Sequence, residues 1–226
     1  MTDSPSPSTD PLNRLLSQVA DGSLSVETAR NEILGRSFED IGFANIDHNR
    51  TRRKGFPEVI FGQGKTAEQI IGIMARMIQR ESIIMVTRIN PDKASAVRAE
   101  FEDAVYHDDA RLLLLKKKEP PVTGRGDILV ISAGTSDIPV AQEAFLTAQA
   151  MGNRVEALFD VGVAGIHRLL AHHQRIQSAD VVIVVAGMEG ALPSVVAGMI
   201  QAPVIAVPTS IGYGANFGGI SALLGM

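Results

Sequence analysis

The second half of the chain repeats one pattern of short apolar runs and longer segments with helical spacing. Four runs rich in β-branched residues have the composition of parallel strands that are buried on both faces: 128–132, 155–159, 181–185 and 204–207. Apolar positions at helical spacing lie between and after these runs, at 138–151, 166–177, 192–200 and from about 217. Strand–helix alternation with short loops predicts right-handed crossovers. We therefore expect an α/β fold with an open, doubly wound parallel sheet from about Gly126 onward.

The first half has shorter and less regular elements. Residues 11–34 have apolar positions at helical spacing, with a break at Asp21 and Gly22, and Ser25 is a suitable N-cap. This stretch predicts a small helical hairpin. Residues 47–56 form a basic segment that we expect to be a loop. The pattern then predicts three strands and two helices, with strands at 58–61, 83–88 and 111–115 and helices at 66–79 and 91–102.

Residues 116–125, with three lysines and two adjacent prolines, have the composition of a linker. We therefore expect a disordered tail at 1–10, a smaller α+β N-terminal region at 11–118 and a nucleotide-binding domain at 119–226. Residues 221–226 resemble the interior of a helix without a cap, from which we expect the sequence to stop before the gene product does.

Composition narrows the classes of function. A net charge of −4 argues against nucleic acid as the main partner, and an aromatic content of 4% argues against a protein that stacks single-stranded bases. No apolar run is long enough for a membrane span, so we expect no membrane partner. The absence of cysteine suits a reducing compartment, and we expect a cytoplasmic location.

The loops that follow the four predicted strands are rich in glycine and small polar residues. In a parallel sheet these loops share one edge, where ligands bind, and each leads into a helix N-terminus that attracts anions. The pattern predicts a phosphate-bearing ligand without naming it, and the absence of a P-loop and of a G-x-G-x-x-G motif argues against ordinary ATP and NAD sites. Seven residues of these loops are candidate substrate contacts: Gly134, Thr135, Asp160, Gly187, Gly190, Tyr213 and Asn216.

Three segments of the second half occur in the same order as in a known enzyme family. The segments 132–139 (Ser-Ala-Gly-Thr-Ser-Asp-Ile-Pro), 186–193 (Ala-Gly through Leu-Pro) and 203–208 resemble motifs of the phosphoribosylaminoimidazole carboxylases. That resemblance implies a flavodoxin-like open sheet. Two departures stand against the purine reaction itself: Ala191 occupies the position of a histidine in that family, and the family's Ser-Ala-His-Arg motif after the second strand is missing.

A second resemblance covers nearly the whole chain. Residues 52–59 (Arg-Arg-Lys-Gly-Phe-Pro-Glu-Val, with His48 before them), 160–168 and 212–219 are similar to motifs of the LarB family. That family carboxylates the pyridinium ring of nicotinic acid adenine dinucleotide and cleaves its phosphoanhydride, releasing AMP, in nickel-pincer nucleotide synthesis. The resemblance implies CO2 or bicarbonate as co-substrate and Mg²⁺ as cofactor. It also implies a homo-oligomer, for which an octamer is one arrangement, and a cysteine nucleophile just after Met226.

The candidate catalytic residues are Ser136, Asp137, Glu189 and His167. Ser136 lies at a loop apex, and Glu189 stands between glycines at a strand end, where a base or a metal contact fits better than a structural role. Asp137 is equally well explained as a helix N-cap, and His167 as a solvated or capping histidine. Arg52, Arg53 and Lys65 are candidate phosphate contacts, although a basic run is more often a solvated surface. The sequence identifies no metal ligands.

Three functions remain open from the sequence. The first is the LarB-type carboxylase/hydrolase, the second a purine-pathway carboxylase or mutase, and the third a nucleotide-binding regulator without catalysis. The missing thiol favours the regulator, and the two departures disfavour the purine enzyme.

Overall fold

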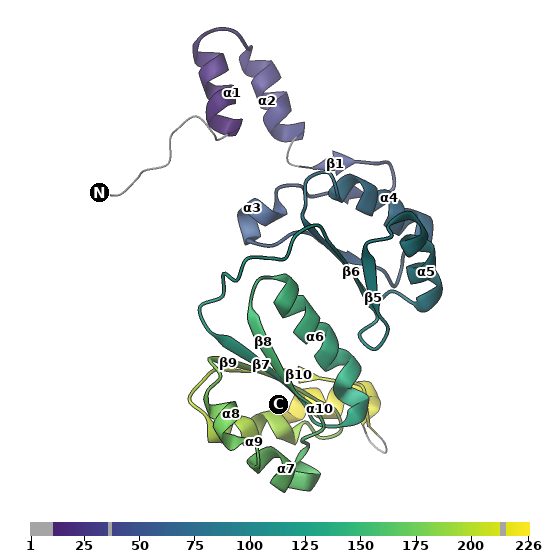
Figure 1. The fold of residues 1–226 in the computed structure, drawn as a ribbon, viewed down its shortest axis with the longest axis vertical. Helices are drawn as coiled ribbons and strands as arrows, with labels where there is room; N and C mark the ends of the chain where they lie inside the picture. The colour runs from purple at the N-terminus through teal and green to yellow at the C-terminus, as the bar shows by residue number, and fades with distance from the viewer. Residues whose placement is uncertain (1–10, 36–37, 213–215) are drawn as a thin grey trace, which may run out of the picture. The chain divides into compact units, whose positions relative to one another are not determined.

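The computed structural model describes residues 11–35, 38–212 and 216–226 (Figure 1). The chain divides into two compact units, one formed by Met1–Glu58 with Gly72–Glu81 and the other by Val59–Ile71 with Ser82–Met226. The boundary expected near residue 118 lies inside the second unit, so the three predicted regions stay a prediction from composition. In the parts of the chain that the structure describes, no helix is both long and apolar enough to cross a membrane.

The first unit begins with the predicted helical hairpin, α1 (Pro11–Ala20) and α2 (Val26–Gly35). Ser25 caps α2 as expected, because its Oγ accepts a hydrogen bond from Thr28 N at 3.0 Å. A two-stranded antiparallel ribbon follows, formed by β1 (Glu39–Asp40) and β2 (Asn45–Ile46). The expected basic loop at 47–56 was wrong in part, because it contains the short helix α3 (Arg50–Lys54), which ends at Gly55 in the left-handed conformation.

The second unit contains the predicted parallel sheet. Its strands are β7 (Asp127–Ser132), β8 (Arg154–Leu158), β9 (Val181–Ala186) and β10 (Val204–Pro208), paired in the order β10-β9-β7-β8. All three pairings are parallel, which confirms the open, flavodoxin-like sheet. Helix α6 (Ile138–Ala150) contributes to the apolar layer on one face, and α9 (Ala191–Met199) contributes to the layer on the other.

The remaining helices of this half differ in detail from the prediction. The helix expected at 166–177 is two helices, α7 (Ile166–Leu170) and α8 (His173–Gln177), which are separated at Ala171 and His172. The chain ends in a 3-10 turn, η3 (Phe217–Gly219), followed by α10 (Ile220–Gly225). The turn arises because Phe217, Gly218 and Gly219 all have positive φ, so that a single α-helix cannot begin at 217.

A second, mixed sheet lies in the same unit, with the order β3-β4-β6-β5. Its strands are β3 (Val59–Phe61), β4 (Ile83–Thr87), β5 (Ala104–His107) and β6 (Leu112–Lys116). Helix α5 (Pro91–Glu100) belongs to the same unit, whereas α4 (Ala67–Met77) is divided between the two units after Ile71. Only β3 and β4 pair in parallel, whereas β6 is antiparallel to both of its neighbours. Strand β5 was not predicted, because Ala104-Val105-Tyr106-His107 lacks the continuous apolar run of a buried strand.

Helix α6 contributes to the cores of both sheets. Ala141 packs with Val130 and Val185 of the parallel sheet. Leu146 and Ala150 instead pack with the buried residues of β4 and β6, among them Met85 and Leu112. The second unit is therefore held together by one helix that is apolar toward two sheets.

Candidate functional site

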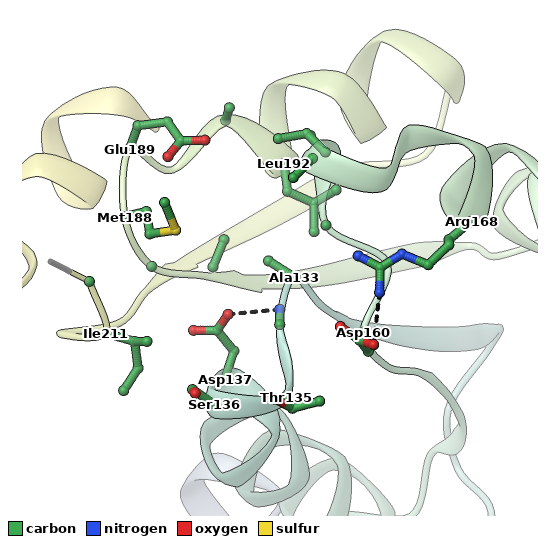
Figure 2. Close-up of a pocket in the computed structure, with 18 residues that line it drawn as sticks. Ala133, Thr135, Ser136, Asp137, Asp160, Arg168, Met188, Glu189, Leu192 and Ile211 are labelled. Atoms are coloured by element: carbon green, nitrogen blue, oxygen red, sulfur yellow. Dashed lines mark hydrogen bonds and ion pairs between the residues drawn. The ribbon is translucent and has the colours of Figure 1, made fainter.

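A cavity of about 520 Å³ lies at the carboxyl edge of the parallel sheet and is lined by the loops that follow all four of its strands (Figure 2). Its position follows from the strand order. The chain leaves β7 for β8 on one side and returns to place β9 on the other side of β7, so the loops after β7 and β9 diverge and open a crevice. This is the edge at which the sequence predicted a ligand.

The loop after β7 is closed by its own aspartate. Asp137 N donates to Gly134 O at 3.1 Å, and Gly134 N donates to Asp137 Oδ2 at 3.0 Å. This reciprocal pair forms the 3-10 turn η1 (Thr135–Asp137), which leaves Thr135 and Ser136 exposed at the cavity wall. The N-cap explanation of Asp137 was wrong for its side chain, because the carboxylate bonds back to Gly134 and makes no capping bond to α6.

The same carboxylate is tied to the loop after β10. Thr209 Oγ1 donates to Asp137 Oδ1 at 2.7 Å, and both residues are buried, with exposed fractions of 5% and 4%. Thr209 N donates to Ala186 O at 3.0 Å and so continues the pairing with β9. Because both oxygens of Asp137 accept a hydrogen bond within the protein, this group fixes loops in place.

The loop after β8 carries an ion pair. Asp160 has a φ of 59°, which is unusual for a residue with a side chain, and its N donates to Ser132 Oγ at 3.1 Å. Its Oδ2 lies 2.7 Å from Arg168 Nη1, and both side chains line the cavity (Figure 2). Gly162 completes this wall, where a Cβ would lie 2.8 Å from Ala133 O.

The loop after β9 presents Glu189 to the cavity (Figure 2). Met188 N donates to Ile211 O at 2.8 Å, which fixes this loop against the one after β10. Gly190 has a φ of 70°, a conformation that favours glycine. Among the described residues the exposed Glu189 carboxylate has no hydrogen-bond or ion-pair partner, so it is free to accept a proton or to contact a ligand.

The last residues of the chain pack beside Glu189. A Cβ added to Gly225 would overlap the carbonyl oxygen of Glu189. On the neighbouring residue, a Cβ at Gly190 would lie 2.6 Å from Ala222 O and 3.1 Å from Met226 Cγ. Helix α10 therefore reaches the loop after β9 closely enough that only glycine fits at both contact points.

The cavity brings together most of the predicted loop residues. Those that line it are Gly134, Thr135, Ser136, Asp137, Asp160, Gly187 and Glu189. Gly190 lies behind this wall against α10, and His167 is exposed on α7 and is not a lining residue. Asn216 is buried and donates to Ser210 O at 3.0 Å, while Tyr213 lies outside the described residues.

Two of the three predicted cations from the first half contact residues near them in the chain. Arg53 pairs with Asp47, and Lys65 Nζ donates to Phe61 O at 3.1 Å. Arg52 is part of α3, and its side chain lies outside what the structure describes. Their assignment as phosphate contacts stays a prediction.

Two residues of the site were missed from the sequence. Arg168 is the only cationic side chain among the cavity-lining residues that the structure describes, beside the carboxylates Asp137, Asp160 and Glu189. The sequence feature that could have identified Arg168 was its position next to His167 in the segment 160–168, which resembles a motif of the LarB family. Thr209 directly follows a predicted strand, and a hydroxyl there gives no signal until the fold shows what it bonds. Within the described ranges, no three histidine, aspartate or glutamate side chains come together in a way that could hold a metal ion.

Comparison with known proteins divides the chain into two matched segments. Residues 38–118 match the family described as LarB/PurE-like N-terminal domain, and residues 127–226 match the AIR carboxylase family. The uncharacterized protein MJ0165 of Methanocaldococcus jannaschii is 39% identical over 211 residues, which cover 90% of this chain and 82% of that protein. The N5-carboxyaminoimidazole ribonucleotide mutase of the same organism is 38% identical over 100 residues, which cover 43% of this chain and 59% of the mutase.

Proposed function

Because this chain belongs to the LarB-like family, with a LarB/PurE-like N-terminal domain before an AIR carboxylase domain, we propose that it carboxylates the pyridinium ring of nicotinic acid adenine dinucleotide. In the same proposal it cleaves the dinucleotide to AMP and a mononucleotide, as a step of nickel-pincer nucleotide synthesis. Membership of this family by itself assigns the protein to the group of carboxylases and mutases, without naming the substrate.

The packing of α10 against Glu189 is the observation that carries the proposal. Pyridinium carboxylation needs a nucleophile that adds to the ring and a base that later removes the ring proton. The family resemblance expects the nucleophile, a cysteine, directly after the segment that ends at Met226. The Gly225–Glu189 contact joins that segment to the backbone of Glu189, the residue whose carboxylate lines the cavity and has no partner among the described residues.

The proposed steps balance without an oxidant or a reductant. A thiolate adds to the cationic ring and gives a neutral dihydropyridine, whose enamine carbon attacks CO2 and forms the new carbon–carbon bond. Glu189 accepts the proton from that carbon, and expulsion of the thiolate restores the pyridinium. The net change is a ring C–H and CO2 converted to a ring carboxylate and a proton. Water supplies the oxygen for the separate cleavage of the phosphoanhydride.

The other lining residues suit the polar parts of such a substrate. The exposed Thr135 and Ser136 hydroxyls lie at the turn that leads into α6, where a helix N-terminus favours a phosphate. Arg168, held by Asp160, adds a positive charge on the wall formed by the loop after β8. The proposed steps do not involve Mg²⁺, and among the described residues no three histidine, aspartate or glutamate side chains come together. The expectation of Mg²⁺ therefore stays a prediction.

The purine-pathway reaction is the second candidate, favoured by the 38% identity to the mutase. That match covers 43% of the chain, whereas the relative matched over 90% of the chain and the LarB/PurE-like domain at 38–118 extend the likeness beyond it. Ala191 lines the cavity at the position where the resemblance expects a histidine in purine enzymes. These two observations lead us to place the dinucleotide first.

These 226 residues contain no cysteine, so the test uses the protein with the cysteine that the proposal requires after Met226. The protein is incubated with nicotinic acid adenine dinucleotide, bicarbonate and Mg²⁺, and products are identified by mass spectrometry. We expect AMP and a biscarboxylated mononucleotide, with loss of at least tenfold in rate for Ser136→Ala, about 1.4 kcal/mol of barrier. Conversion of N5-carboxyaminoimidazole ribonucleotide, with the dinucleotide left intact, would replace our proposal by the purine reaction. Binding of the dinucleotide without any turnover would favour a regulator.

We also propose a homo-oligomer formed through the end of the chain. Three apolar side chains of η3 and α10 are strongly exposed, namely Phe217, Leu223 and Leu224 at 75%, 61% and 81%. Apolar surface of this kind is typical of an interface. Light scattering at micromolar concentration should give a mass at least twice that of one chain, which is 24.1 kDa for these 226 residues, and a monomeric mass would contradict the proposal.

A further inference from the structure

We propose that Thr209 is a positioning residue of this site, whose hydroxyl sets the loop after β7 by holding Asp137 in place. It does not line the cavity and therefore does not touch the substrate directly. The inference concerns the geometry of the site, and its kinetic consequence rests on the function proposed above.

Thr209 and Asp137 are joined by a buried hydrogen bond. Thr209 Oγ1 donates to Asp137 Oδ1 at 2.7 Å between two side chains that are almost fully buried. The second oxygen of Asp137 accepts from Gly134 N. A carboxylate only accepts hydrogen bonds, so without the hydroxyl one of its oxygens would be buried and unsatisfied. The pair is therefore a specific requirement of the folded site, unlike an exposed polar contact.

The hydrogen bond between Thr209 and Asp137 is connected to the cavity through the turn at Gly134. Asp137 closes the turn at Gly134, and that turn fixes the positions of Thr135 and Ser136 at the cavity wall. Loss of the bond on one side of Asp137 frees the carboxylate to rotate and weakens its hold on Gly134. Thr209 thus acts on the exposed hydroxyls through Asp137.

Thr209 is also connected to the loops after β9 and β10. Ile211 N lies 3.4 Å from Thr209 Oγ1, and Ile211 O accepts from Met188 N, next to Glu189. Gly187 leaves room for the hydroxyl, since a Cβ there would lie 2.7 Å from Thr209 Oγ1. One side chain therefore links the loops after β7, β9 and β10, and these loops carry Ser136 and Glu189 on opposite sides of the cavity (Figure 2).

The experiment compares three substitutions in the full-length protein. Thr209→Val keeps the shape of the side chain and removes the donor, whereas Thr209→Ser keeps the donor and removes a methyl group. Thr147→Val is the matched control, because Thr147 lies on α6 away from the cavity and its hydroxyl contacts Met85 Sδ at 3.6 Å. We expect kcat/KM for the dinucleotide to fall at least tenfold in Thr209→Val, mainly through kcat. Thr209→Ser and Thr147→Val should stay near the wild-type rate.

A double substitution tests whether Thr209 acts through Asp137. If it does, Thr209→Val combined with Asp137→Ala should be no slower than Asp137→Ala alone, because without the Asp137 carboxylate the second change finds no hydrogen bond left to break. Multiplied effects would overturn the assignment, as would equal rates for Thr209→Val and Thr209→Ser.

A readout without substrate separates this inference from the proposed function. Amide hydrogen exchange at Gly134 should be faster in Thr209→Val than in wild type and unchanged in Thr209→Ser and Thr147→Val. If the wild-type protein does not act on the dinucleotide, the function proposed above fails while this measurement still decides the role of Thr209. Unchanged exchange at Gly134 in Thr209→Val would overturn the role.

Discussion

The two sheets of the second unit share α6 as a packing partner, yet they differ in what they offer to a ligand. In the parallel sheet, all four carboxyl ends emerge at one edge, and the four following loops line one cavity. In the mixed sheet, β6 runs against both of its neighbours, so its carboxyl end lies at the edge opposite to the carboxyl ends of β3, β4 and β5. The direction of the strands, more than the composition of the loops, decides where polar groups gather. We therefore expect changes in the mixed sheet to affect stability and changes at the parallel edge to affect rate.

The largest effect should come from the core of the mixed sheet. Leu112 is fully buried in β6, so Leu112→Ala should lower the free energy of unfolding by about 2–5 kcal/mol through the cavity it leaves. Denaturant titration measures this, with Val105→Ala on the exposed side of β5 as a control expected within about 0.5 kcal/mol of wild type. The folded variant should retain its kcat, and a parallel loss of kcat would break the division between the sheets.

At the parallel edge, Glu189→Gln should have the opposite profile. The carboxylate is exposed and has no partner among the described residues, so the melting temperature should stay unchanged. Removal of a general base should lower kcat about 100-fold or more, which corresponds to about 2.7 kcal/mol. Glu102→Gln, on the surface of the mixed-sheet region, is the matched control and should leave kcat intact. A stable but fully active Glu189→Gln variant would remove Glu189 from the mechanism.

Substitutions at two glycines test whether the contact between α10 and Glu189 is needed for turnover. Gly225→Ala would push α10 away from Glu189 and should lower kcat about tenfold, near 1.4 kcal/mol, with a small loss of stability. Gly198→Ala on α9 meets no atom within 4 Å and should, if anything, raise the free energy of unfolding by up to about 1 kcal/mol. Steady-state kinetics and thermal unfolding of both variants measure these changes in kcat and in stability. Equal rates for the two would show that the α10 contact is not needed for turnover.

The smallest effect concerns His107 in β5 of the mixed sheet. Burial, and then the nearby charge of Lys116, hold the pKa of His107 below its usual 6.5. The unfolded chain therefore binds the proton more readily, so the contribution of His107 to stability is complete above pH 6.5 and is lost as the pH falls through the lower folded-state pKa. We expect unfolding free energy to decline less steeply between pH 7 and pH 5 in His107→Gln than in wild type. Identical pH slopes would show that His107 titrates alike in both states.

The regular part of the fold was predictable because burial on both faces leaves a clear pattern. The runs near Val130, Val184 and Val207 identified parallel strands, and the small residues after them identified the edge where the cavity lies. The sequence pattern did not predict those elements whose existence or bounds depend on contacts with distant parts of the chain. The helix expected at 166–177 is interrupted at His172, and β5 exists because it pairs with β6.

The candidate site was predictable in its location and less so in its connections. Ser136, Asp137 and Glu189 were found because they stand in loops whose composition suits a ligand. Arg168 could not be paired with Asp160 from the sequence, because that contact depends on how α7 turns back over the loop after β8. Thr209 was missed for the same reason, since 72 residues separate it from Asp137.

The two-sided packing of α6 has a consequence for attempts to take the protein apart. Leu146 and Ala150 are covered by β4 and β6, which come from the matched LarB/PurE-like segment. An excised fragment that begins after residue 118 would expose this apolar strip to water, although every cavity-lining residue would still be present in it. We therefore expect the second half to lose stability when it is expressed without the strands that cover this face of α6.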